Sequence, residues 1–451
     1  MSPGARPLRW WLTARDGGAR LTEQAPLSNG HHAGAARLHV DTSRRFQTLE
    51  GFGGAFTEAA ATVWQRLSPA QQQTFLQDCF DPQHGHGYTL CRVHINSCDF
   101  SLGHYAHADQ PGDVALQHFS IARDRQHLLP MIQAAQRVAG RPLKLLASPW
   151  SPPAWMKSNQ QMAHGGQLLP QYRATWAQCF VRFIQAYEAE GVPIWGVTVQ
   201  NEPEAQQRWD SCLYTAEDER DFVRDHLGPA LQAAGLGHVR IVVWDHNRDA
   251  MVERASTILG DPEAARYVWG TGFHWYLEDH FDHVQLVHDA WPDKGLLFTE
   301  GCQEGGPHHG SWALGERYAR SMVNDLNRWT AGWIDWNLLL DEQGGPNHVG
   351  NFCSAPVLAE PAADALHRQS SFWYIGHFAR FIEPGARRVL CAATREALEC
   401  TAFVNPDGRC AVVAMNRGED ALPFTLAIDG ERHALELPPR AIATIVRSAG
   451  R

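Results

Sequence analysis

The sequence predicts an α/β fold: a (β/α)₈ TIM barrel with an additional antiparallel β-sandwich domain. Eight apolar, strand-like segments alternate with helix-like segments over most of the chain. After about residue 385, short runs of alternating apolar and polar residues replace that pattern. A doubly wound open sheet is the rival for the first part. It normally has a G-x-G-x-x-G turn after its first strand, and Gly51-Phe-Gly-Gly54 lacks that spacing.

The expected barrel strands are apolar and rich in β-branched residues, which is typical of buried parallel strands. They cover residues 49–56, 88–95, 143–150, 195–201, 240–246, 267–275, 295–300 and 332–340. The glycines of the first segment suit a strand that another backbone approaches closely.

Helix signals lie between these segments. Ser68 and Pro69 supply a cap and a first-turn proline for a helix over 69–80. A second helix, with its apolar residues on one face, is expected to end near Glu190. A capping signal begins a third helix, and Gly235 ends it.

The last part of the chain is typical of an antiparallel sheet domain. Its alternating runs are separated by turn residues such as those of Asn405-Pro-Asp-Gly408. The runs are 388–393, 398–404, 409–415, 421–428, 431–437 and 440–446. We expect this domain to pack against the barrel, with a separate sugar-binding module as the alternative. Residues 1–45 are weakly patterned, with one strand expected at 36–40.

The charge and histidine patterns exclude several function classes. A net charge of −10 argues against a nucleic-acid partner. The histidine pairs at 31–32 and 308–309 point apart on a strand, and no HExxH motif occurs, so we expect no metal and no cofactor. A serine hydrolase would need a G-x-S-x-G turn, which the sequence lacks.

The cysteines and the N-terminus bear on the compartment. Ten cysteines are scattered without CxxC pairs, which predicts buried free thiols in a reducing compartment. The first residues contain no apolar stretch long enough for a signal sequence or a membrane span. We therefore expect a cytoplasmic protein without stable membrane insertion, or a secreted one if a signal has been removed. The oligomeric state is open.

Two glutamates follow apolar strands. Glu202 stands between Asn201 and Pro203, which cannot continue a central strand, and Glu300 closes the segment 295–300. Barrel enzymes keep their chemistry at these strand ends. Cleavage of a glycosidic bond needs a proton for the leaving oxygen and an anion facing the sugar carbon, which two carboxyl groups supply.

By strand count, Glu202 ends the fourth strand and Glu300 the seventh, on opposite sides of the barrel mouth. We assign Glu300 as the nucleophile and Glu202 as the acid/base. An ionised Glu300 is expected to raise the pKa of Glu202 and keep it protonated. Asn201 can offer an amide to the 2-hydroxyl of the sugar.

At these residues the chain resembles glycoside hydrolase family 30, the family of lysosomal glucosylceramidase, from Leu49 to about residue 446. The motifs that carry the resemblance are EGFGGAF (50–56), CRVHINSCDFS (91–101), LLASPWSPPAWMKSN (145–159), TVQNEPE (198–204), FHWY (273–276), LFTEG (297–301) and GWIDWNLLLDEQGGPNHVGNF (332–352). NEP alone is shared by many retaining barrel enzymes, but the motifs together are highly specific.

The resemblance implies an exo-acting enzyme that hydrolyses β-glucosides with a retaining mechanism, with glucosylceramide as a candidate substrate. It implies a barrel over 46–384 and a β-sandwich formed by 385–451 and completed by 1–45. It matches Glu202 to the acid/base and Glu300 to the nucleophile. The residues that it places around the terminal sugar are Asp99, Trp150, Asn201 and Trp336, with Tyr276 near the nucleophile and His274 and Asn351 at the rim.

These residue types suit a sugar site. Asp99 can hold two hydroxyls through charge-assisted hydrogen bonds, and Trp150 and Trp336 offer flat faces to a sugar ring. Glu204 departs from the lysosomal enzyme, which has a small residue there, and it adds a negative charge near the cleft. A β-D-fucosidase or β-xylosidase of the same family is therefore an alternative. A catalytically inactive carbohydrate-binding protein is the alternative from a different class.

Overall fold

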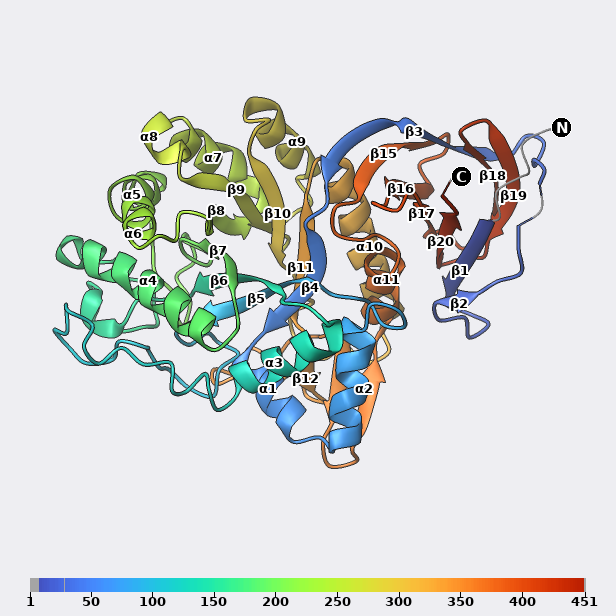
Figure 1. Ribbon diagram of the computed structural model, residues 1–451. Coiled ribbons are helices and arrows are strands. Elements are labelled where there is room, and N and C mark those ends of the chain that lie inside the picture. The colour runs from blue at the N-terminus through green and yellow to red at the C-terminus, as the bar shows by residue number, and fades with distance from the viewer. Residues whose placement is uncertain (1–7, 28, 450–451) are drawn as a thin grey trace.

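The computed structural model describes residues 8–27 and 29–449, and its centre is a closed barrel of eight parallel strands (Figure 1). Around the barrel the order is β10, β11, β4, β5, β6, β7, β8, β9. The strands are β4 (Gly51–Phe56), β5 (Leu90–Ile95), β6 (Lys144–Pro149), β7 (Ile194–Thr198), β8 (Arg240–Asn247), β9 (Val268–His274), β10 (Gly295–Glu300) and β11 (Gly332–Asn337). The barrel predicted from the sequence is confirmed, with β7 as its fourth strand and β10 as its seventh.

The last expected strand, 332–340, is two strands in the structure. β11 ends at Asn337, and β12 (Leu339–Asp341) belongs to a small three-stranded sheet with β13 (Val357–Glu360) and β14 (Ala365–Arg368). The apolar character resumes at Leu338 directly after Asn337, so the apolar pattern could not reveal the break. The small sheet holds the ends of the long loop between β12 and β13.

The glycines of β4 allow a neighbouring strand to approach closely, as expected. A Cβ atom on Gly53 would lie 1.9 Å from the carbonyl oxygen of Leu90 on β5. No side chain fits at that distance, so this position of the barrel requires glycine.

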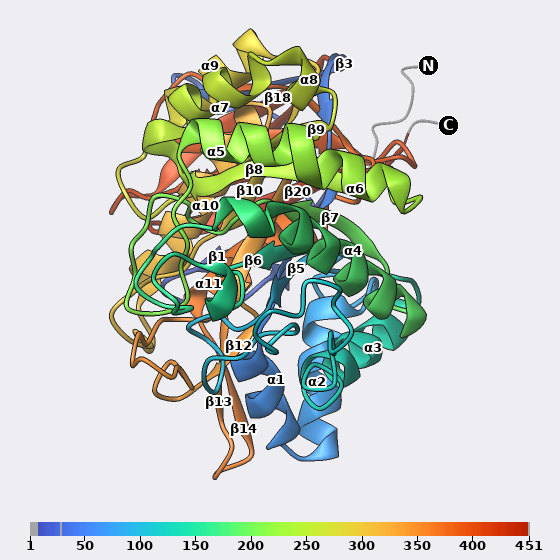
Figure 2. The same cartoon turned by 90° about the vertical axis from the view of Figure 1, so that its left-hand side faces the viewer.

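Helices surround the barrel strands, as Figure 2 shows from the side. They are α1 (Glu58–Gln65), α2 (Pro69–Phe80), α3 (Leu128–Ala139), α4 (Arg173–Ala189), α5 (Ala216–Phe222), α6 (Gly228–Ala233), α7 (Met251–Leu259), α8 (Pro262–Ala265), α9 (Phe281–Ala290), α10 (Trp312–Asn327) and α11 (Ser370–Ala379). The predicted start of α2 is confirmed, since the Ser68 side chain accepts a hydrogen bond from the Gln71 amide. The helix expected before Gly235 is divided, because a π-helical turn at Val223–Leu227 separates α5 from α6.

A nine-stranded sheet forms the second layer, on the right of Figure 1. Its order is β19, β18, β3, β15, β16, β17, β20, β1, β2. The strands are β1 (Leu8–Ala14), β2 (Thr22–Glu23), β3 (Ala36–Thr48), β15 (Arg387–Ala393), β16 (Leu398–Val404), β17 (Cys410–Asn416), β18 (Leu422–Ile428), β19 (Glu431–Leu437) and β20 (Ala441–Arg447). Its pairings are antiparallel except for β18 with β3, which is parallel. The six C-terminal strands match the expected runs.

The N-terminal region contributes more strands than the sequence predicted. The expected strand at 36–40 is the start of the thirteen-residue β3, and β1 and β2 were not foreseen. One face of β1 carries Leu8, Trp10, Leu12 and Ala14, but Trp11 on the other face interrupts the alternation. Its partner β20 lies at the opposite end of the chain, which local patterning cannot show.

Both faces of the nine-stranded sheet are buried along β17. Along β17, Cys410, Val412 and Ala414 belong to the core of the sheet domain, while Ala411, Val413 and Met415 pack into the larger core that includes the barrel helices. This alternation explains why the segment is a continuous apolar run. It confirms the expectation that the domain packs against the barrel.

His377 on α11 links the barrel to the sheet domain. Its ring nitrogens lie 2.9 Å from the hydroxyls of Thr444 on β20 and Thr13 on β1, and all three side chains are fully buried. Burial lowers the pKa of His377 from the ordinary 6.5 to about 3. The imidazole is therefore neutral in the folded protein at ordinary pH.

This lowered pKa predicts a loss of stability in acid. Below pH 6.5 the unfolded chain takes up a proton at His377, whereas the folded chain does not do so until about pH 3. Between pH 7.5 and pH 5, this proton uptake by the unfolded chain lowers the free energy of unfolding of the wild type by about 2 kcal/mol. His377→Gln keeps hydrogen-bonding groups and should show a correspondingly flatter dependence on pH in urea denaturation. A control variant at the exposed His31 should keep the wild-type slope; an unchanged slope in His377→Gln would contradict the linkage.

All ten cysteines are free thiols, and all except Cys391 are buried, as the sequence predicted. Within residues 8–27 and 29–449, no helix combines the length and the apolar composition that crossing a bilayer requires.

Candidate active site

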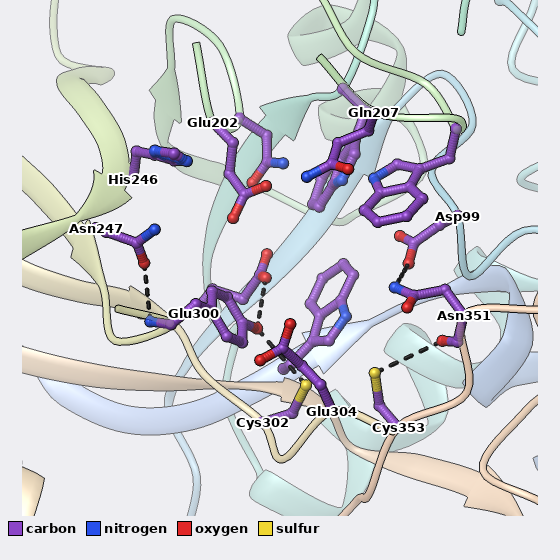
Figure 3. A pocket seen from close by; sticks show the side chains of 15 residues that line it. Asp99, Glu202, Gln207, His246, Asn247, Glu300, Cys302, Glu304, Asn351 and Cys353 are labelled. Carbon is purple, nitrogen blue, oxygen red and sulfur yellow. Dashed lines mark hydrogen bonds between the residues drawn. The ribbon is translucent and has the colours of Figure 1, made fainter. Parts of the chain in front are cut away.

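A pocket with a cavity volume of about 130 Å³ lies at the carboxyl ends of the barrel strands (Figure 3). Its walls combine carboxylates, amides and aromatic rings: Asp99, Trp150, Asn201, Glu202, Gln207, Trp209, His246, Asn247, Tyr276, Glu300, Cys302, Glu304, Trp336, Asn351 and Cys353. Of the nine site residues proposed from the sequence, eight line this pocket.

The two glutamates predicted to act together lie close to each other. Glu300 is the last residue of β10, and Glu202 comes four residues after the end of β7. One carboxylate oxygen of each, together with a ring nitrogen of His274, lies within 4.8 Å of the other two atoms. In Figure 3 both carboxylates point into the pocket.

The backbone at Glu202 is held in an uncommon conformation. Its φ angle is +47°, in the left-handed region that a non-glycine residue adopts only at some cost. Its amide donates to the carbonyl of Asp245 at 3.0 Å, and the Asn201 amide donates to that of Pro149 at 2.8 Å. These bonds to the two neighbouring strands fix the direction of the Glu202 side chain.

Glu300 receives two hydrogen bonds that favour its anion. Arg92 donates from Nη1 to Oε2, and the Tyr276 hydroxyl donates to Oε1 at 2.8 Å. A carboxylate held by a guanidinium and a phenol on different oxygens is fixed in orientation. The Tyr276 side chain therefore lies beside Glu300, the position that the resemblance implied for it.

Arg92 is the fully buried cation beneath the pocket. Besides Glu300, it donates to Ser148 at 2.9 Å, to the Asn201 side chain at 2.9 Å and to Asp245 at 2.7 Å. Five N–H donors in a rigid fork allow one arginine to orient four partners. Arg92 thus connects the strands that carry both glutamates.

His274 does not lie at the rim, where we expected it. It is fully buried at the end of β9, with Nδ1 3.2 Å from Glu202 Oε1 and Nε2 2.9 Å from Asp245 Oδ1. The bulged end of β8 places Asp245 behind the imidazole. His274 therefore contacts one of the two glutamates and does not line the pocket.

The pKa directions at the two glutamates differ from the simple expectation. Burial raises the pKa of Glu300, and Glu202 adds to the rise, although the charges of His274 and Arg92 oppose it. Burial also acts to raise the pKa of Glu202, but the hydrogen bond from His274 and the charges of His246 and His274 together outweigh it and leave that pKa below its usual value. Without substrate, Glu300 therefore does not keep Glu202 protonated as we expected, because His274 supplies a positive partner.

The proton is instead held on the imidazole. Burial acts to lower the pKa of His274, but Glu300, Asp245 and Glu202 raise it to about 9. At neutral pH one proton thus lies on the hydrogen bond between His274 and Glu202. Its transfer to Glu202 leaves the net charge of the site unchanged, so the two groups titrate as a pair.

Asp99 forms one wall of the pocket. Its Oδ2 accepts from the side-chain amides of Asn347 and Asn351, both at 3.1 Å, and Asn351 lines the pocket as expected. Burial raises the pKa of Asp99 to about 7. A buried carboxyl with a defined orientation can bind sugar hydroxyls at this wall.

The two predicted tryptophans lie together on the floor of the pocket. Trp150 and Trp336 stack with ring centroids 5.1 Å apart and planes inclined by 19°. The Arg92 guanidinium carbon lies 4.7 Å from the centroid of Trp150. The rings therefore support the buried cation as well as offering an apolar surface to a ligand.

Several residues of this site were missed from the sequence. Asp245, His246 and Asn247 follow an apolar run in β8, which is the pattern that identified Glu202, so the same criterion could have found them. The others lie in loops without such a signal: Gln207, Trp209, Cys302, Glu304 and Cys353. For Arg92, on β5, the sequence leaves open a structural role or an orienting role toward the carboxylates, and its hydrogen bonds to Glu300 and Asn201 fit the orienting role.

Two family models match the chain. Residues 49–382 match the glycosyl hydrolase family 30 TIM-barrel domain, and residues 385–445 match the glycosyl hydrolase family 30 beta sandwich domain.

Related proteins cover nearly the same length. The chain is 37% identical to the lysosomal acid glucosylceramidase of Mus musculus over 86% of this chain and 79% of that protein. Among solved structures it is similar to SrfJ from Salmonella typhimurium, with a TM-score of 0.94 and 37% identity, covering 98% of this chain and all of the other. It is also similar to an endo-β1,6-glucanase, with a TM-score of 0.89 and 28% identity over 98% of this chain and all of the other.

Proposed function

This chain belongs to glycosyl hydrolase family 30 and is a glycosidase, and we propose that it is a retaining, exo-acting enzyme that hydrolyses β-D-glucosides. The observation that carries the retaining mechanism is the distance between the two carboxylates. Retaining enzymes hold their carboxyl groups about 5–5.5 Å apart, whereas inverting enzymes leave about 6.5–9.5 Å for a water molecule. Oxygens of Glu202 and Glu300 within 4.8 Å of each other favour the retaining geometry.

In the first step, Glu300 attacks the anomeric carbon from the face opposite the leaving group. Glu202 gives the leaving oxygen a proton drawn from its hydrogen bond with His274. The covalent bond removes the negative charge of Glu300. Arg92 and Tyr276 hold the carboxylate in place for the attack.

In the second step, Glu202 accepts a proton from water as the water attacks the same carbon. The bond to Glu300 breaks, its carboxylate is restored, and the sugar leaves with its original anomeric configuration. The two inversions at one carbon account for retention.

The closed wall of the pocket supports exo action. The side-chain amides of Asn347 and Asn351 donate hydrogen bonds to Asp99. The buried carboxyl of Asp99 can bind the hydroxyls of one sugar that lie farthest from the bond to be cleaved. A chain that continued past this sugar would meet these side chains. The glucose assignment follows the relatives named as glucosylceramidases.

The surroundings of the site support an amphiphilic leaving group. Three exposed apolar side chains lie close in sequence to residues of the site: Leu102 follows Asp99 by three positions, Leu277 follows Tyr276, and Phe352 follows Asn351. Glu204, which argued for a polar cleft, lies 3.4 Å from Arg254 and does not line the pocket. A glycolipid with a β-glucosyl head group fits these features.

A panel of aryl β-glycosides tests the sugar. We expect nitrophenol release from the β-glucoside to exceed that from the β-fucoside, β-xyloside and β-galactoside in kcat/KM. We also expect glucosylceramide in detergent to yield glucose, with the β-anomer formed first in the NMR spectrum. Preference for another sugar would overturn the glucosidase proposal, an α-anomer would overturn retention, and no turnover at all would favour the inactive binding protein.

A second candidate is an endo-β-1,6-glucanase, which the similarity to such an enzyme favours. The polar Gln207 and Glu304 lining the pocket suit a sugar as the leaving group. The size of the products from β-1,6-glucan distinguishes the two: an exo enzyme releases monosaccharide only, whereas an endo enzyme releases oligosaccharides from the start.

A further inference from the structure

Three loops bring two histidines and an aspartate together beside the pocket, outside the residues that line it. His104 lies in the loop after β5, Asp210 in the loop after β7, and His348 in the loop between β12 and β13. One ligand atom of each lies within 4.8 Å of the other two. We propose that these three side chains bind a divalent transition-metal ion of the zinc class.

The orientation of the His348 ring carries the argument. Its Nδ1 lies 3.2 Å from the carbonyl oxygen of Ser101 and must donate there, because a carbonyl only accepts. In the neutral ring, Nε2 then presents a lone pair. A metal-binding imidazole has this arrangement, with its other nitrogen donating to a backbone carbonyl.

The lone pair of His348 faces a carboxylate oxygen. Nε2 lies 3.7 Å from Asp210 Oδ2, and neither atom has a hydrogen-bond partner within residues 8–27 and 29–449. Asp210 is only 1% exposed, so solvent does not supply the missing hydrogen-bond partner for its Oδ2. The gap exceeds an ordinary hydrogen bond of about 2.7–3.2 Å. It is close to the roughly 3.4 Å between two ligands of a tetrahedral ion with bonds near 2.1 Å.

The third ligand completes an accessible site. His104 Nδ1 lies 3.1 Å from Asp210 Oδ1, which also accepts from Ser97 at 2.7 Å. The side chain of His104 is 44% exposed, so an ion can enter from solvent and keep a water ligand. Two imidazoles and one carboxylate are a donor set that suits zinc and its first-row neighbours.

The ion would connect the loops that form one wall of the pocket. The His348 amide donates to the carbonyl of Asp99 at 3.2 Å, and Trp209, which precedes Asp210, lines the pocket. A metal bound here would hold these loops in one arrangement without touching the reacting atoms. This inference does not depend on the proposed substrate.

Zinc binding by the full chain tests the proposal, with calorimetry giving the stoichiometry and affinity. We expect the wild type to bind one Zn²⁺, and we expect His104→Ala to weaken binding by about 100-fold or more, since losing even an outer partner of a metal ligand costs about 10–100-fold. His348→Ala should behave in the same way. A rise in Tm with added Zn²⁺ should occur in the wild type and be lost in both variants.

Two controls separate this site from other zinc binding. The double variant His31→Ala/His32→Ala removes two exposed imidazoles from the sheet domain and should keep the site. Glu300→Gln should also keep it, although Glu202, His274 and Glu300 form a second group that could hold an ion. Loss of binding in Glu300→Gln with retention in His104→Ala would place the ion at the glutamates and overturn the proposal. Because His104 is exposed, its variant is expected to fold, and unchanged affinity in it would equally overturn the proposal.

Discussion

Glu300→Gly is expected to lose turnover of β-glucosides by about 10⁴-fold or more, as other enzymes do when a covalent nucleophile is removed. The carboxylate that Arg92 and Tyr276 orient is then absent, so no covalent intermediate can form. The steady-state rate with an aryl β-glucoside measures the loss. Glu278→Gly is the matched control, because it removes a side chain that is 90% exposed two positions after Tyr276.

Azide should partly restore activity to Glu300→Gly, and the product should be the α-glycosyl azide. The small anion enters the space left by the carboxylate and attacks the anomeric carbon once, from the face opposite the β-linked leaving group. NMR of the isolated product gives its configuration. A β-azide would mean that Glu300 is not the nucleophile.

The glutamate pair could be predicted because its signal is local. An apolar strand that ends abruptly in a carboxylate requires only a few neighbouring residues to be recognised, and the parallel barrel brings such ends together. The same logic would have located Asp245 at the end of β8. It could not have located Trp209 or Glu304, which lie in loops whose paths depend on tertiary contacts.

The proton arrangement could not be predicted from the sequence. It depends on Arg92, Asp245 and His274, which come from three strands and meet only in the folded barrel. Proximity of two carboxylates alone implied a raised pKa for Glu202. A protonated imidazole between Glu202 and Asp245 reverses that direction, because an opposite charge at hydrogen-bonding distance favours the ionised carboxyl.

Prediction of the strands also succeeded where the sequence signal was local and failed where it depended on a distant partner strand. Strands with an alternating or apolar pattern bounded by turn residues were found nearly in full. The division of 332–340 into β11 and β12 was missed, since it follows from the pairing of β12 with β13. β1 was missed because its partner β20 lies more than 400 residues away.

The acid/base role that we propose for Glu202 predicts a loss that depends on the leaving group. Glu202→Ala is expected to lower kcat/KM by about 10²–10⁴-fold for glucosides with poor leaving groups, the range that general acid catalysis contributes. For a dinitrophenyl glucoside the loss should be far smaller, because that leaving group departs without a proton. Azide should give the β-glycosyl azide here, since it attacks the intermediate on Glu300 from the face vacated by Glu202.

The pH profile connects this prediction to His274. The wild type should lose kcat/KM for a poor leaving group as the pH rises through about 9, because the proton shared by His274 and Glu202 is present below that pKa and absent above it. In Glu202→Ala that proton no longer reaches the leaving oxygen, so the alkaline decline should disappear. Equal losses on good and poor leaving groups, or an alkaline limb that persists in the variant, would show that the proton comes from another group.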